Sequence, residues 1–162
     1  MSASRRLLIV GGIALALLGM TYGVWYAVFA EHQELDGIVK SLTTSFSAAS
    51  KQDSSAATTA LKEYKEVKYS YDRHVDVHGH WIGLAMILIV LGIGLDRVSF
   101  GEQPKLILAA ALLVGSFLFP LGVLLQTLSR GPVPPVLAVV GSALVIASLA
   151  GMTLGFARGQ KP

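Results

Sequence analysis

The sequence predicts an all-α integral membrane protein with four transmembrane helices, of which the first two extend into an extracytoplasmic antiparallel helical hairpin. Three observations predict this fold class. The chain of 162 residues is 53% hydrophobic and 14% charged, with a mean hydropathy of +0.62, which lies outside the range of ordinary soluble domains. Charged residues are missing from four long stretches. The one long polar segment, residues 31–77, carries a repeat that is typical of packed helices.

The four uncharged stretches are the candidate membrane spans of a four-helix bundle. They place the spans at about residues 7–30, 78–96, 106–128 and 133–157, where the second uncharged stretch itself ends at Leu95. A hydrocarbon core about 30 Å thick needs about 20 apolar residues in helical form. The first run is longer than the apolar core of a signal peptide, so we expect it to be retained as a span. Four spans place both termini on the same side of the membrane.

Basic residues near the ends of the spans predict the orientation. Six of them flank the spans on the side of the termini, namely Arg5, Arg6, Arg97, Lys105, Arg158 and Lys161. The basic residues of segment 31–77 are diluted among eight acidic ones. The positive-inside rule therefore predicts cytoplasmic termini in a bacterial inner membrane, with segment 31–77 outside. The net charge of +3 is then a topology signal and does not indicate nucleic-acid binding.

Segment 31–77 has the periodicity of two packed helices joined by a turn. Steps of three and four residues define two seams, which predict two helical arms, each continuous with its span. Residues 50–55 form the turn, with Asp53 or Ser54 as the cap of the second helix. The first seam comprises Trp25, Val28, His32, Leu35, Val39, Leu42, Phe46 and Ala49, and the second comprises Ala60, Tyr64, Val67, Tyr71, His74, His78, Trp81 and Ala85.

Three of the four histidines fall on these seams. A turn centred near Gln52 places His32 within one helical turn of His74 and His78, and these two share a helix face at i,i+4 spacing. Three imidazoles that converge in this way can bind one metal ion, with Asp72 and Asp76 as oxygen ligands or as partners that orient the rings.

Zinc or copper is the first candidate, because nitrogen–metal bonds of about 2.0 Å fit closely packed helices. Haem b is the second, with His32 and His78 as axial ligands, although it requires helices that lie farther apart. Two other interpretations stay open for these histidines. They are polar packing in a structural hairpin, and a pH switch, since histidine titrates near neutrality.

These features predict a small accessory membrane protein that binds a metal ion or haem, as part of a respiratory, electron-transfer or metal-handling complex. The alternatives are a non-catalytic scaffold or assembly subunit, or a pH or metal sensor. The sequence has no nucleotide-binding loop and no zinc-protease motif, which argues against an enzyme, and a membrane-bound enzyme that uses the same histidines stays open as a third alternative. With no cysteine, it has neither disulfides nor thiolate metal sites.

The expected partners are the lipid bilayer and either other membrane subunits or further copies of the chain, and not nucleic acid. Small residues recur every fourth position in the last span, at Ala143, Ala147, Gly151 and Gly155. Such a stripe lets helix backbones approach closely. It predicts either a face for a partner subunit or packing within the bundle.

Overall fold

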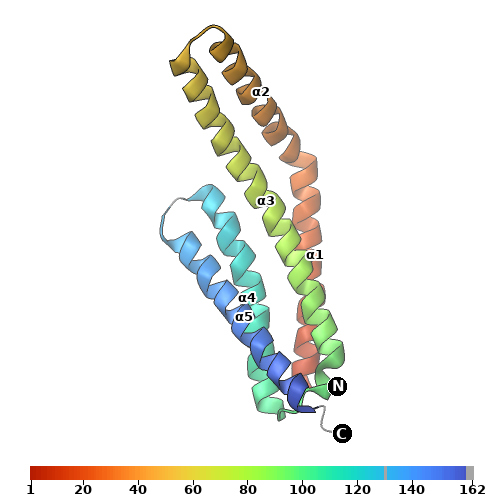
Figure 1. Ribbon diagram of the computed structural model, residues 1–162. Helices are drawn as coiled ribbons and strands as arrows, with labels where there is room; N and C mark the ends of the chain where they lie inside the picture. Colours follow the sequence, from red (N-terminus) through yellow and green to blue (C-terminus); the bar gives the residue numbers. More distant parts are fainter. Residues whose placement is uncertain (130, 160–162) are drawn as a thin grey trace. The chain divides into compact units, whose positions relative to one another are not determined.

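In the residues that it describes, 1–129 and 131–159, the computed structural model consists of helices joined by short turns and contains no strand. The predicted all-α class is therefore confirmed (Figure 1). Lys161, one of the residues used to predict orientation, lies outside the described residues. The helices are α1 (Ala3–Phe29), α2 (Glu31–Ser50), α3 (Ser54–Gly94), the short 3₁₀ turn η1 (Leu95–Arg97), α4 (Glu102–Leu128) and α5 (Val133–Gly159).

Four of these helices, α1, α3, α4 and α5, are long and apolar enough to cross a membrane. This agrees with the four predicted spans and indicates a multi-pass membrane protein. The chain divides into two compact units. The bundle unit contains Met1–Thr21 and the chain from Asp76 onward, and the hairpin unit is Tyr22–Val75. Helices α1 and α3 each contribute to both units.

In the bundle unit, α4 and α5 pack with their backbones in close contact at glycines. A Cβ atom added to Gly122 would lie 2.4 Å from the backbone nitrogen of Ala138. One added to Gly141 would lie 2.4 Å from the backbone nitrogen of Phe119. Real Cβ atoms do not come so close to backbone atoms, so any larger residue would push the helices apart. Small residues at such crossings are the usual packing device of membrane helices.

The predicted small-residue stripe of α5 divides between two environments. Gly155 is buried, and a Cβ atom there would lie 2.5 Å from Cγ1 of Val98. Ala143 and Ala147 are exposed. The stripe is therefore used for packing within the bundle at its C-terminal end only.

Helices α1 and α3 also meet at glycines within the bundle unit. A Cβ atom on Gly12 would lie 3.0 Å from the carbonyl oxygen of Ala85, and one on Gly92 would lie 3.2 Å from the backbone nitrogen of Ile9. At the ends of these helices, the Arg5 guanidinium pairs with Asp96 at 2.8 Å. The α1 terminus thereby joins the turn that precedes α4.

In the hairpin unit, α2 and α3 are joined by the three residues Lys51–Asp53. Gln52 has a φ of 58°, in the left-handed region. The backbone N–H of Gln52 donates to Ala49, and that of Asp53 donates to Ala48, which is the pattern of a Schellman C-cap. The Asp53 carboxylate then accepts the backbone N–H of Ala56 at 2.9 Å and caps α3, as one of the two predicted caps.

The two arms of the hairpin differ in continuity. Helix α3 runs without a break from Ser54 to Gly94, as the second seam predicts. The first arm is interrupted at Ala30, whose φ of −120° and ψ of −37° leave the helical region. This residue separates the end of α1 from the start of α2. The backbone N–H of Ala30 still donates to Tyr26, and its carbonyl still accepts from Glu34, so the interruption is confined to one residue.

Candidate functional site

The face of α2 that packs in the hairpin lies one residue away from the predicted seam. Its two fully buried residues, Ser41 and Ala48, are small, whereas Val39 and Phe46 of the predicted seam are 64% and 69% exposed. The face of α3 is the predicted one, and its Ala60 is only 3% exposed. The observed positions on α2 are Glu34, Ile38, Ser41, Ser45 and Ala48.

Close approach of the two arms explains this shift. Gly37 faces α3, where an added Cβ atom would lie 3.2 Å from Cγ1 of Val67. Ser41 is 5% exposed and donates its hydroxyl to the carbonyl of Gly37 in its own helix. Ser45 donates across the hairpin to the carbonyl of Ala57 at 3.2 Å. A face of glycine, serine and alanine admits a nearer neighbour than one of leucine and phenylalanine.

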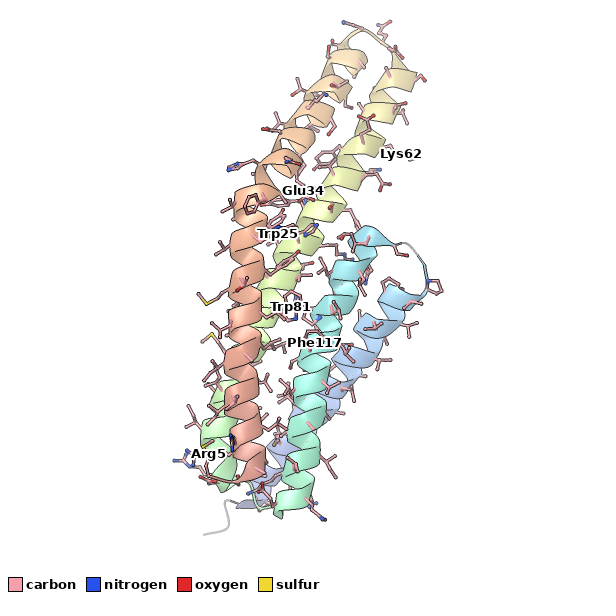
Figure 2. All side chains as sticks on the ribbon, turned by 180° about the vertical axis from the view of Figure 1, so that it is seen from behind. Arg5, Trp25, Glu34, Lys62, Trp81 and Phe117 are labelled. Atoms are coloured by element: carbon pink, nitrogen blue, oxygen red, sulfur yellow. The ribbon has the colours of Figure 1, made fainter. Side chains whose placement is uncertain are left out.

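The shift brings Glu34 into the hairpin as the centre of a polar network (Figure 2). Its Oε2 accepts the hydroxyl of Tyr26 from α1 at 2.6 Å. Its Oε1 accepts the hydroxyl of Ser70 from α3 at 2.6 Å. The side chain of Glu34 is 16% exposed, so these two donors replace most of the water that a free carboxylate would bind.

His74 extends this network on α3. Its Nε2 lies 3.8 Å from Oε1 of Glu34, and its side chain is 14% exposed. Its Nδ1 is hydrogen-bonded to the hydroxyl of Tyr22 at 2.5 Å. The ring of Tyr26 stacks on the imidazole with centroids 4.9 Å apart. We call these five residues, Tyr22, Tyr26, Glu34, Ser70 and His74, the polar pin, because they connect α1, α2 and α3 within the hairpin unit.

The structure gives three different settings to the three histidines that the sequence predicts as ligands of one metal ion. His32 lies on the exposed side of α2, because the packing face is shifted by one residue. His74 belongs to the polar pin of the hairpin unit. His78 belongs to the bundle unit, where its Nδ1–H donates to the carbonyl of Gly19 at 2.9 Å. The fourth, His80, donates its Nδ1–H to the carbonyl of Asp76.

The two aspartates predicted as further ligands do not complete a site either. Both carboxylate oxygens of Asp72 accept hydrogen bonds from Nζ of Lys68 at 2.8 Å, and Asp76 is exposed. Within residues 1–129 and 131–159, no group of three or more histidine, aspartate or glutamate side chains could hold a metal ion. The predicted metal site at His32, His74, His78, Asp72 and Asp76 therefore finds no support in the geometry.

The sequence analysis predicted only His74 as a site residue among the members of the polar pin. It missed Tyr22, Tyr26, Glu34 and Ser70. A signal was present, because Tyr22 and Tyr26 stand at i,i+4 on one helix and Ser70 and His74 do so on another. Such pairs share a helix face. Glu34 carried no comparable signal, because the apolar repeat of α2 predicts that the next residue, Leu35, packs against α3.

The fold and the polar pin define a class of protein, a small helical membrane protein with a polar hairpin. No protein-family model, no curated protein and no solved structure matches this chain.

Proposed function

We propose that the protein is a non-catalytic accessory subunit of a membrane complex and that its hairpin binds another protein. The observation that supports this proposal is an apolar face left open on α2. Leu35 is 38% exposed, and Val39 and Phe46 are more than half exposed. We call Leu35, Val39, Leu42 and Phe46 the outer face, of which Leu42 is half-buried.

Exposed apolar residues on α1, α4 and α5 need no special explanation, because lipid covers them in a membrane protein. The outer face lies instead on a helix whose sequence, from Glu31 to Ser50, is mostly polar and is placed outside the membrane by the predicted topology. Burying a valine, leucine or phenylalanine that was fully exposed to water is worth about 1.5–3 kcal/mol. Three half-exposed side chains therefore offer several kcal/mol to a partner that covers them.

The spacing of the outer face favours a helix as the partner. Together with Val28, His32 and Ala49, the outer face continues a strict alternation of three and four residues. This is the a and d pattern with which one helix receives the side chains of another. We therefore assign the α2 seam that the sequence predicts to a partner helix instead of α3.

The polar pin supports this role by fixing the orientation of α2. Glu34 lies on the side of α2 that faces α3 and is bonded to Tyr26 and Ser70. Rotation of α2 about its axis would break both hydrogen bonds to a largely buried carboxylate. The pin thus holds α2 with Val39 and Phe46 turned outward.

Binding of zinc, copper or haem stays a prediction and is not part of this proposal, because the part of the chain that the structure describes has no group of three or more histidine, aspartate or glutamate side chains that could hold a metal ion. Metal analysis and an absorption spectrum of the purified protein test it, with a His74→Ala/His78→Ala variant as the control. Bound metal or a haem spectrum that disappears in this variant would restore the metal-binding hypothesis.

The proposed function is tested by purifying the tagged protein from its native membranes in mild detergent. We expect a complex that contains a second membrane protein at fixed stoichiometry, measured by native mass spectrometry. Val39→Asp should remove that subunit. The matched control is Thr44→Asp, on the same helix, where Thr44 is exposed and donates only to the carbonyl of Lys40 in its own helix. A chain that is monomeric in native membranes, or equal loss in both variants, would overturn the proposal.

A further inference from the structure

We infer that the bundle unit binds one anionic phospholipid in a groove of α1, with the lipid phosphate on the guanidinium of Arg6 and an acyl chain over Gly11. The groove lies in a different unit from the outer face, so this inference does not rest on the proposed function. It follows from the position of the groove, from its length and from the charge at its end.

The groove lies at the N-terminal end of α1, on a face that the rest of the bundle leaves open. Its volume is about 570 Å³, within the range of about 300–1,000 Å³ that small-molecule sites occupy. Apart from Arg6, the side chains used here, Leu7, Val10 and Ala14, are apolar, and Val10 is 56% exposed. Because α1 is long and apolar enough to cross a membrane, a groove on its open face is in contact with lipid.

The length of the groove matches one leaflet of a bilayer. From Arg6 to Ala14, α1 rises by about 12 Å, and half of a hydrocarbon core is about 15 Å thick. A transmembrane helix of another protein would need a contact surface along the whole span. The acyl chain of one phospholipid reaches only to the middle of the bilayer, so a single lipid is the better occupant of this groove.

Basic residues dominate the end of the bundle unit where the groove begins. Asp96 accepts a hydrogen bond from the Arg5 guanidinium at 2.8 Å, and Glu102 accepts the backbone N–H of Ser4 at 2.9 Å. Both acidic side chains at this end therefore already bind the start of α1. The described charged residues at this end are two acidic and five basic, namely Asp96, Glu102, Arg5, Arg6, Arg97, Lys105 and Arg158.

The guanidinium of Arg6 is the group in the groove that can recognise an anion. Arg6 is exposed, and in the described part of the chain it forms no ion pair. A guanidinium offers two parallel N–H donors to a phosphate, and the long side chain can reach the headgroups from the end of a span. The phosphate of a zwitterionic lipid is already compensated by its own ammonium group. Charge complementarity therefore favours a lipid with net negative charge.

The first experiment compares phosphatidylglycerol with phosphatidylcholine of the same acyl chains. Binding to the full-length protein in detergent is measured by native mass spectrometry. We expect one bound phosphatidylglycerol, held about fivefold more tightly than phosphatidylcholine, and Arg6→Gln should remove this preference. The matched control is Arg97→Gln. It also removes one exposed positive charge at this end of the unit, but Arg97 does not line the groove, so the affinity should change by less than about twofold.

The second experiment locates the acyl chain. A phosphatidylglycerol with a diazirine in its acyl chain is cross-linked to the full-length protein by light, and the labelled peptide is identified by mass spectrometry. We expect the label within residues 7–14 of α1. Ala14→Phe fills the groove and should remove most of this label, whereas Ala147→Phe, at an exposed position of α5, should leave it unchanged.

Three results would overturn the inference. Equal losses of affinity in Arg6→Gln and Arg97→Gln would show general charge attraction without a site. Displacement of phosphatidylglycerol by millimolar inorganic phosphate would show an anion site that does not use the acyl chain. A photoreactive residue at position 14 that cross-links a second protein subunit at full stoichiometry would show that a partner helix occupies the groove.

Discussion

Removing the carboxylate of Glu34 should loosen the hairpin more than any other single change to the polar pin. Glu34→Ala deletes the acceptor of two hydrogen bonds, those from Tyr26 and Ser70 at 2.6 Å each. Tyr26 is 4% exposed, so its hydroxyl would lose its acceptor with little access to water. A hydrogen bond to a charged group contributes about 1.5–3 kcal/mol, and a buried donor left without a partner costs about 1–3 kcal/mol. We therefore expect a loss of about 3 kcal/mol in the local stability of the hairpin.

Amide hydrogen exchange in detergent micelles measures this loss directly, because it reports the opening free energy of each helix separately. Amides of α2 and of the first half of α3 should exchange about 150-fold faster in the Glu34→Ala variant, since 1.4 kcal/mol corresponds to a tenfold change. Amides of α4 and α5 should be unaffected. Glu63→Ala, which removes an exposed carboxylate from α3, is the matched control and should change exchange by less than about threefold.

A double-mutant cycle locates the effect in the pin. Tyr26→Phe removes one donor and keeps the ring that stacks on His74. If the two residues act through their hydrogen bond, the double variant with Glu34→Ala should be about 1–2 kcal/mol more stable than the sum of the single changes predicts. Additive effects, or an effect of Glu34→Ala below about 0.5 kcal/mol, would refute the interpretation of Glu34 as the centre of the network.

Three further changes test other parts of the structure. Gln52→Gly should stabilise the hairpin by about 0.5–1 kcal/mol, because glycine adopts the left-handed φ without steric cost. Amide exchange in the last turn of α2 should become slower, and faster exchange would contradict the observed turn. Gly141→Val should lower the stability of the α4–α5 pair by about 3 kcal/mol in thermal unfolding. The control Gly79→Ala, whose added Cβ has no atom of another part of the chain within 4 Å, should not destabilise the protein. Equal effects of the two variants would refute the packing argument. His74→Ala should lower the stability of the hairpin by about 1–3 kcal/mol, whereas His32→Ala should change that stability by less than about 0.5 kcal/mol. A larger loss for His32→Ala than for His74→Ala would place His32 in the hairpin core.

The membrane helices were predictable because lipid solvation imposes a simple rule on sequence. A span must be apolar over a fixed length, so the uncharged runs locate α1, α4 and α5 to within a few residues. The helices nevertheless extend into polar residues that a hydropathy criterion leaves out. Helix α4 begins at Glu102, four residues before the predicted span, because a helix continues into water until a residue such as Gly101 ends it.

The candidate site was less predictable because two faces of α2 satisfy different criteria. The large apolar residues, such as Val39 and Phe46, predict one packing face. The small residues Gly37 and Ser41 permit closer packing on the adjacent face, and the structure uses that one. A change of one position rotates a helix by about 100°. This is enough to move His32 out of the predicted cluster and to bring Glu34 in.

The open outer face of α2 also has a consequence for the life of the newly made chain. Under the proposed function, Val39 and Phe46 of a chain without its partner are accessible to chaperones and to proteases that recognise exposed apolar segments. A partner present at about 100 times its dissociation constant would add about 2.7 kcal/mol to the stability of the folded hairpin. Differences of this size change the cellular abundance of a protein several-fold. If the proposed function is correct, the amount of this protein in the membrane should therefore follow the supply of the proposed partner.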